Sequence, residues 1–502
     1  MAAWLENLIR AISPEAAYRR EAWRQADALL RDAYDAGSGD RLNAGWRAVN
    51  DSAEMTDRYS RDNVRARARD LERNSDLMAS LVGPYKRNVV GAGFNLQAKT
   101  EDSDLNDKIE AYWKEWCRKR NCDITRTQSL TQILRMAEER KRVDGGILIH
   151  KVYTGGGLIP FKLQCLEVDE LAVTVIAPHD KDCRVIGGVE LDQYNRARGY
   201  WIQRYDLDGL TMMPDPVYVK ADDMIYIYTK KRPSQVREMS DMAASMSGIR
   251  DAHEFQTAVS VKQRIEACLS VFIKKITPSG FGRNATGFGR NATGSGPTKQ
   301  YEGRTLTPGM IHELNAGDDI AVINPQGQGT DASMYIKTQQ HILGAGQGLS
   351  YEATSRDMSQ SNYSSARQGI IEDELTYLED RELLMDALDE IYESFLISLV
   401  LSGLVSIPDF WTDKRKYFRH EWIRPPKQWI DPAKEANATK VALLSGQKTF
   451  REVSEENGQD WRERIDDMAA EIAYAKERGI DIGGMVYGIA SEDDAGAAYT
   501  GT

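Results

Sequence analysis

The chain has 502 residues and a mass of 56.4 kDa, enough for about three domains. Hydrophobic residues make up 41% and charged residues 28%, which excludes collagen-like, proline-rich and wholly disordered classes. Lys and Arg number 65 against 76 Asp and Glu, and the net charge of −11 argues against a protein that binds DNA tightly over its whole surface.

The cysteines and the apolar runs indicate free thiols and no membrane segment. Five cysteines, an odd number at low density, are typical of a reducing compartment. Cys117 and Cys122 have no second Cys or His pair at zinc spacing, so we expect no metal there. We expect no export signal, and the stretch 395–407 is too short to span a membrane and is predicted to be a buried helix end.

Residues 1–60 are predicted to form an N-terminal arm. Apolar residues up to Ile12 share one helical face before Pro14, which is typical of a stripe that docks on a neighbouring subunit or on the chain's own body. From Asp57 to Arg73, six arginines alternate with acids. We expect a solvated helix here, with a phosphate-facing helix as the weaker alternative. Residues 88–94 then read as a helix end that runs into a strand.

Between about 145 and 230 the pattern changes to short β-rich runs separated by glycine turns. This predicts a mostly antiparallel sheet with hairpins. The runs are Gly146–Tyr153, Phe161–Leu166, Gly199–Ile202 and Met224–Tyr228. Asp206 and Asp208 lack the remaining ligands of a calcium loop, so Asp208-Gly209 is interpreted as a hairpin turn.

An apolar stripe that begins at Ile249 predicts a rod-like helix reaching Ile276, about 40 Å long. The sequence Gly280–Thr286 is then repeated without change at 287–293. Six basic residues and one acid lie between Ile273 and Arg304, and the glycine-rich backbone predicts a mobile loop tip.

Helical patterns dominate the rest of the chain. A strand is expected at 320–323, a helix from about 331 to 343, a polar segment at 356–365, and a long helix to about 401. This last helix carries ten acids and only one base between residues 372 and 393. Three capped helices then form a small C-terminal module, and the tail from 480 is expected to fray. Their starts are Asp431-Pro432, Thr449-Phe450-Arg451-Glu452 and Asp460.

Catalytic motifs are missing from the sequence. It contains no G-x-x-x-x-G-K-[ST], no H-E-x-x-H and no G-x-S-x-G, and its six histidines are scattered. We therefore expect no enzymatic activity, no cofactor and no metal. A nuclease that acts on packaged DNA stays as a distant alternative, since pairs of acids are not detectable from sequence.

Two segments together resemble the portal proteins of tailed bacteriophages, of the lambda-like family. The first runs from Gly348-Leu349-Ser350-Tyr351-Glu352 to Tyr363-Ser364-Ser365-Ala366-Arg367. The second is Trp429-Ile430-Asp431-Pro432 with Leu443-Leu444-Ser445-Gly446, Thr449, Glu452 and Asn457-Gly458, and Asn88-Val89-Val90-Gly91 fits as well. The resemblance covers about residues 55–480. The duplicated glycine-rich repeat belongs to no family pattern, so its role stays open.

The resemblance implies a helix-rich α+β portal fold. Its expected parts are an N-terminal arm (1–60), an α/β wing (61–240), stem helix 1 (241–272), a small α/β clip with the basic glycine-rich loop (273–328), stem helix 2 (329–349), a tunnel loop (350–366), a long helix that returns to the wing (367–430), a helical crown (431–479) and a flexible tail (480–502).

It also implies a ring, typically of twelve subunits, at one capsid vertex of the virion. DNA would enter through it, driven by terminase, and leave through it at infection. The expected partners are other copies of the chain, the major capsid protein, the terminase large subunit, a head–tail adaptor and double-stranded DNA bound without sequence preference. Assembly is expected in the host cytoplasm, with no membrane contact.

Three sets of candidate site residues follow from this resemblance. A channel must let DNA slide, so small polar residues and an acidic wall fit better than many phosphate contacts, and salt limits the repulsion to about 8 Å. The tunnel-loop set is Arg356, Ser359, Gln360, Ser361, Asn362 and Arg367, with the arginines as phosphate contacts. The acidic-helix set is Glu372, Asp373, Glu374, Glu379 and Asp380. The clip set, expected to contact terminase or the adaptor, is Phe281, Arg283, Phe288, Arg290 and Lys299.

Alternatives remain for the polar segment, for the basic insert and for the chain as a whole. The polar segment could be a surface linker, and the basic insert could be a flexible loop without a partner. The whole chain could be another ring-forming virion protein, such as a tail hub or adaptor, although its length and the order of helix, clip and helix argue against that.

Overall fold

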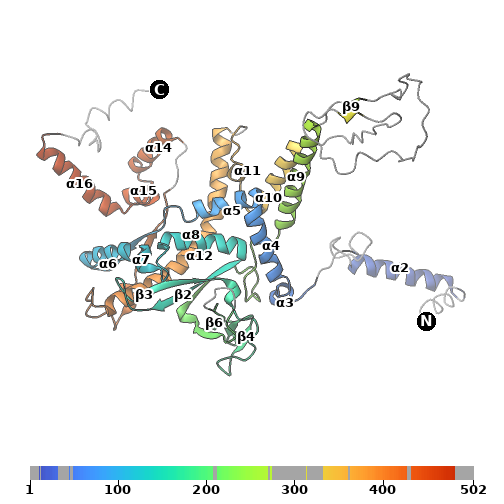
Figure 1. Cartoon of the computed structure of the whole chain (residues 1–502), viewed down its shortest axis with the longest axis horizontal. Helices are drawn as coiled ribbons and strands as arrows, with labels where there is room; N and C mark the ends of the chain where they lie inside the picture. The colour runs from blue at the N-terminus through green and yellow to red at the C-terminus, as the bar shows by residue number, and fades with distance from the viewer. Residues whose placement is uncertain are drawn as a thin grey trace, which may run out of the picture. The chain divides into compact units, whose positions relative to one another are not determined.

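The computed structural model describes residues 11, 13–31, 45, 49–206, 212–268, 272–273, 312–313, 332–359, 362–426 and 431–480. It divides into two units, Met1–Thr56 and Asp57–Thr502. The first unit contains helix α2 (Pro14–Arg31), which exposes Tyr18 and Trp23. Figure 1 shows the elements of both units along the chain, and α3 (Ala53–Asp57) lies at their boundary.

The second unit opens with helices whose ends are set by local capping. Ser129 forms a capping box with Gln132, and Gly145 ends the helix with φ +95°. The predicted run from a helix end into a strand is confirmed at residues 88–95. The elements are α4 (Arg61–Asn74), α5 (Asp76–Asn88), β1 (Asn95–Ala98), α6 (Ser103–Trp116), α7 (Lys119–Cys122) and α8 (Leu130–Asp144).

The predicted solvated arginine helix is only half right. Arg67 and Arg73 on α4 are exposed, but Arg61 and Arg65 are buried on the opposite face. Arg65 binds the buried Glu238 at 3.0 Å, and Arg69 binds Asp144 at 2.7 Å. The helix therefore uses its arginines at every fourth position as intramolecular ion-pair partners, because residues i and i+4 share one face.

The β-rich region is antiparallel with hairpins, as predicted, but it forms two sheets rather than one. The first has the order β3-β2-β8 and the second the order β4-β5-β6-β7. The turn expected at 208–209 lies outside the described residues. The strands are β2 (Gly146–Tyr153), β3 (Phe161–Leu166), β4 (Arg184–Ile186), β5 (Val189–Leu191), β6 (Ala197–Ile202), β7 (Val217–Lys220) and β8 (Met224–Tyr228).

Two helices run side by side to form a rod (Figure 1). They are α9 (Met246–Cys268) and α10 (Ala332–Gly346). The ring centres of Phe255 on α9 and Tyr335 on α10 lie 4.3 Å apart. The prediction that the first helix reaches Ile276 is wrong, because residues 272–273 form strand β9, which pairs in parallel with β10 (His312–Glu313). The second helix continues through Gly344 rather than ending before it, since a glycine lowers helix stability without forbidding the conformation.

The largest core forms where the long helix meets the first sheet. After α11 (Tyr351–Ser355), α12 (Tyr363–Leu401) extends over 39 residues, and most apolar residues of its C-terminal third are buried. The predicted buried helix end at 395–407 is confirmed, with Phe395 5.1 Å from the ring of Trp113. β11 (His420–Ile423) follows the short helix α13 (Lys414–Tyr417) and pairs with β1 in antiparallel orientation.

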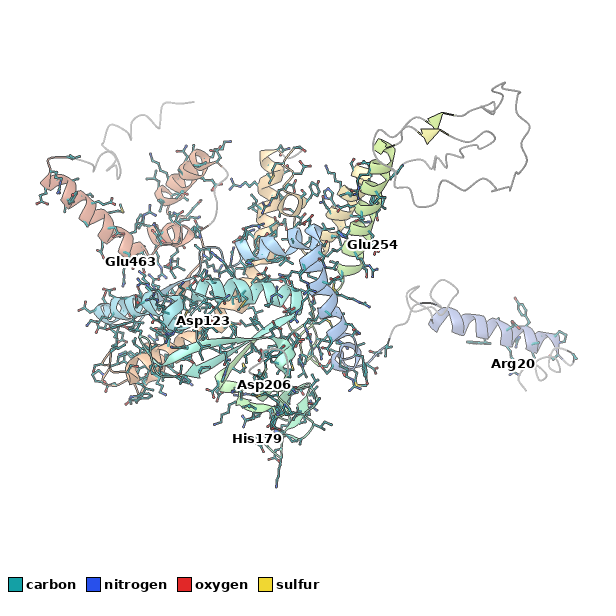
Figure 2. All side chains as sticks on the ribbon, in the orientation of Figure 1. Arg20, Asp123, His179, Asp206, Glu254 and Glu463 are labelled. Atoms are coloured by element: carbon teal, nitrogen blue, oxygen red, sulfur yellow. The ribbon has the colours of Figure 1, made fainter. Side chains whose placement is uncertain are left out.

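The C-terminal module, residues 431–480, has the three helices and caps that the sequence predicts. They are α14 (Pro432–Leu444), α15 (Phe450–Glu456) and α16 (Trp461–Glu477), capped by Asp431, Thr449 and Asp460. Lys114 of α6 lies 2.6 Å from Glu463, the residue of α16 labelled in Figure 2. Asn95 also donates a hydrogen bond to the carbonyl of Gly458 at 3.1 Å, so polar contacts join this module to α6 and β1.

Candidate DNA-channel site

The polar segment between α10 and α12 is fixed to the long helix at its start. The hydroxyl of Ser350 accepts a hydrogen bond from the backbone of Ala353 and so caps α11. Ser350 also donates its backbone N–H at 2.6 Å and its hydroxyl at 2.7 Å to the carboxylate of Asp373 on α12. Burial raises the pKa of Asp373, and the two hydrogen bonds from Ser350 oppose that rise. One buried carboxylate thus holds the segment in place.

The residues just before this serine are also held by neighbouring elements. Gln347 is buried and donates to the hydroxyl of Ser245 at 2.9 Å, while the hydroxyl of Tyr85 donates to the Gln347 carbonyl. Gly348 has φ +72°, and a β-carbon there would lie 2.9 Å from the Thr376 hydroxyl, which donates to the Gly348 carbonyl. Glycine is therefore required at this entry point.

The two predicted phosphate-contacting arginines are both exposed. Arg356 ends α11 in a left-handed conformation with φ +56°, and Arg367 lies on the first turns of α12. Burial lowers the pKa of Arg87, at the end of α5, and the positive charge of Arg356 lowers this pKa further. Sequence reasoning missed Arg87, since a basic residue in the last turn of a helix is ordinary there.

The small polar residues of the segment are placed as turn and cap residues. The backbone N–H of Ser359 donates to the Asp357 carboxylate at 3.0 Å, and the Ser359 side chain is exposed. Asn362 caps α12 through a reciprocal pair of hydrogen bonds with Ser365. Gln360 and Ser361, also predicted here, lie outside the described residues.

The five predicted acidic residues of α12 divide into two groups. Asp373 and Asp380 are buried, and Glu374 binds Arg381, so these three carboxylates have partners within the chain. Glu372 and Glu379 are exposed, with Glu372 accepting a hydrogen bond from the Gln368 side chain. The exposed face continues with three further acids that make no ion pair among the described residues: Glu382, Asp386 and Glu393.

Asp380 belongs to a buried charge cluster that joins α8 to α12. Its carboxylate binds Lys141 at 2.6 Å and also Arg142, and Lys141 lies 3.1 Å from Asp241. Burial and, after it, the Asp380 charge raise the pKa of Glu138 to about 7. Although burial acts in the opposite direction, Lys141 and Arg142 hold the pKa of Asp241 below its usual value. The sequence gives no sign of this cluster, because its residues on α8 lie far along the chain from Asp241 and Asp380.

The clip residues Phe281, Arg283, Phe288, Arg290 and Lys299 lie outside the described residues. Cys117 and Cys122 are free, and burial raises the pKa of the Cys122 thiol to about 12. In the ranges that the structure describes, no three His, Cys, Asp or Glu residues converge to hold a metal ion. No helix in those ranges is both long and apolar enough to cross a bilayer.

Comparison with known proteins gives consistent matches. A family model described as phage portal protein, lambda family, matches residues 39–381. The probable portal protein of Halomonas phage phiHAP-1 is 22% identical over 464 residues, which cover 88% of this chain and 86% of the relative. The portal protein of Escherichia phage N15 and portal protein B of Escherichia phage lambda are each 21% identical, covering 89% and 88% of this chain and 90% of each relative.

Among solved structures, the virion of the native gene transfer agent particle aligns with a TM-score of 0.43 at 12% identity, covering 77% of this chain and 89% of the matched chain. The neck of the empty gene transfer agent particle aligns with a TM-score of 0.44 at 13% identity, covering 78% and 93%. Because the matched family model spans more than half of the sequence, the chain belongs to the lambda family of phage portal proteins.

Proposed function

We propose that copies of this chain close into a ring at one capsid vertex. Double-stranded DNA passes through the ring during packaging and again at ejection, and the ring is the platform for head–tail attachment. The observation that carries this proposal is the family match over residues 39–381, supported by portal relatives aligned over most of the chain. A subunit number of twelve is part of the proposal. The same match disfavours a tail hub or adaptor, and we assign no reaction to the chain.

Within this ring, we assign the parts by their order. Residues 61–240 are the wing, α9 and α10 the stem, and 273–328 the clip. Residues 350–366 are the tunnel loop, and α12 returns from it towards the core. The C-terminal module is the crown. What supports the stem assignment is the side-by-side packing of α9 and α10, with a long insertion between their ends.

The tunnel loop is proposed as the narrowest DNA contact. Apart from Met358, its exposed residues around Ser359 are polar, and Arg356 and Arg367 are proposed to contact phosphates. Few cations and the exposed acids of α12, starting at Glu372 and Glu379, favour sliding, since each neutralised phosphate strengthens binding by counterion release. Anchoring of Ser350 to Asp373 fixes the start of the loop against α12.

The partners are proposed by the same reasoning. The basic clip loop docks to the terminase large subunit during packaging and to a head–tail adaptor afterwards, with complementary charge raising the association rate. The wing faces the major capsid protein. Assembly takes place in the host cytoplasm before the ring becomes part of the virion.

Electron microscopy and native mass spectrometry of the purified chain test the ring. We expect a ring with an axial opening and one dominant subunit number. A lone globular particle, or a closed disc without an opening at any concentration, would overturn the proposal.

Photo-crosslinking tests the tunnel loop in filled particles. A photoreactive amino acid at Ser359 should crosslink to DNA, whereas one at Tyr194, an exposed residue of the β5–β6 turn, should not. Equal crosslinking from both positions, or none from Ser359, would refute the assignment of this loop while leaving the ring intact.

A further inference from the structure

A lysine without a counter-ion lies beneath the connection between β2 and β3. Lys162 on β3 is only 2% exposed, and its side chain makes no ion pair or hydrogen bond among the described residues. A β-carbon at Gly157 would lie 3.7 Å from the Lys162 ammonium, so this ammonium lies against the glycine. The buried Lys151 on β2, by contrast, binds Glu390 at 3.1 Å. An unpaired buried ammonium is strongly unfavourable, which indicates a missing anion.

A second cation lies against the neighbouring glycine. A β-carbon at Gly156 would lie 3.8 Å from a terminal nitrogen of Arg126. Arg126 is exposed, has φ +61°, and makes no ion pair in the described part of the chain. Gly156 and Gly157 both have φ +93°, a conformation that favours glycine. Two consecutive glycines therefore lie against two cations, and the side-chain oxygen of Asn121 also lies 3.7 Å from a β-carbon at Gly157. Lys119 and Arg120 on α7 add further exposed positive charge.

The carboxylates close in sequence to this cluster already have partners. Asp123, labelled in Figure 2, accepts five hydrogen bonds from the backbone and hydroxyl groups of Thr125 and Thr127 and from the backbone of Gln128. These donors hold the pKa of Asp123 below its usual value even though burial acts to raise it. Glu115 binds Arg118 at 2.8 Å. Neither carboxylate neutralises Lys162 or Arg126.

We propose that Lys162, Arg126 and the Gly155–Gly157 connection form a binding site for a phosphate group. A guanidinium and an ammonium on two sides match the several acceptor oxygens of phosphate, and the absent side chains leave space for it. The connection is closed by a hydrogen bond from Thr154 to Pro160 at 3.0 Å, and its glycines allow it to move aside from the ammonium. The site uses elements separate from the tunnel loop. The phosphate comes either from inorganic phosphate or from a nucleic-acid backbone.

The first test measures the thermal unfolding midpoint of the full chain in inorganic phosphate against chloride at equal ionic strength. We expect a saturable rise for the wild type and for Lys108→Met, which removes an exposed lysine on α6. Lys162→Met should weaken phosphate binding at least tenfold while leaving the phosphate-free protein no less stable. An unsaturable response, or one that Lys162→Met leaves unchanged, would overturn the proposal.

A second variant keeps the test decisive if Lys162→Met does not fold. Arg126→Gly removes the guanidinium at a position whose φ suits glycine, and it should also weaken phosphate binding several-fold. Equal binding by Arg126→Gly and wild type would count against the site. A short DNA duplex, followed by fluorescence anisotropy, then identifies the source. Competition between duplex and phosphate supports the site as a nucleic-acid contact, and phosphate binding without competition supports it as an ion site.

Discussion

Asp380→Asn should destabilise the protein more than any other single carboxylate change on α12. Asp380 is buried and binds both Lys141, at 2.6 Å, and Arg142. The substitution keeps the shape of the side chain. It leaves the buried Lys141 and Arg142 with two nearby carboxyl groups, those of Asp241 and Glu138, and Glu138 is partly protonated near neutral pH. Breaking a buried ion pair on one side costs about 3–5 kcal/mol, and two charge-assisted hydrogen bonds at about 1.5–3 kcal/mol each give a similar figure.

Equilibrium urea unfolding followed by tryptophan fluorescence measures this loss of stability, because Trp113 on α6 packs on Phe395 of α12, the helix that carries Asp380. The matched control is Asp386→Asn, an exposed carboxylate on α12 that should change the free energy of unfolding by no more than about 0.5 kcal/mol. Removing the Asp380 charge should also move the pKa of Glu138 down towards its usual value. If both variants unfold alike, the cluster is not the clamp between α8 and α12 that its geometry indicates.

Three further outcomes are expected. The folded state holds the Glu138 proton more tightly than the unfolded state, so stability from this group falls as pH rises from 4.5 to about 7. Glu138→Gln should remove a decline on the order of 3 kcal/mol, visible in unfolding at several pH values. Glu110 behaves alike, because burial and then Asp460 and Glu463 raise its pKa to about 7. Trypsin should therefore release the C-terminal module faster from the wild type than from Glu110→Gln at pH 8, with the release rates at each pH expressed relative to this variant. This ratio should be smaller at pH 5. Asp373→Ala should free Ser350 and increase hydrogen exchange over residues 350–359 without changing exchange in α8; unchanged exchange at both would contradict the anchoring role.

The features that sequence predicts well here are set by neighbouring residues. The caps at Asp431, Thr449 and Asp460 bind backbone groups two or three residues away, so the pattern alone defines the three helices. Strand runs such as Gly146–Tyr153 are likewise visible in their β-branched and aromatic content. Their grouping into two sheets is not, because it depends on pairings between distant segments such as β2 and β8.

Sequence reasoning fails mainly in predicting which residues the charged side chains pair with. Arg65 was expected in solvent, yet its partner Glu238 lies far along the chain. The sequence pattern predicts Asp380 as one more member of an acidic face, but in the structure this residue binds Lys141 and Arg142. A charge on an amphipathic helix has the same local pattern whether it faces water or a distant counter-ion, so only tertiary structure distinguishes the two.

The hydrogen bonds from Ser350 to Asp373 and the N-cap at Asn362 fix the two ends of the polar segment between α11 and α12. Neither attachment uses a side chain of residues 357–359. This short stretch is therefore a place for grafting: a tag, a reporter or a longer polar sequence inserted there leaves both attachment points untouched. Under the proposed function, residues of this stretch can be varied to alter the channel lining independently of the body that carries it.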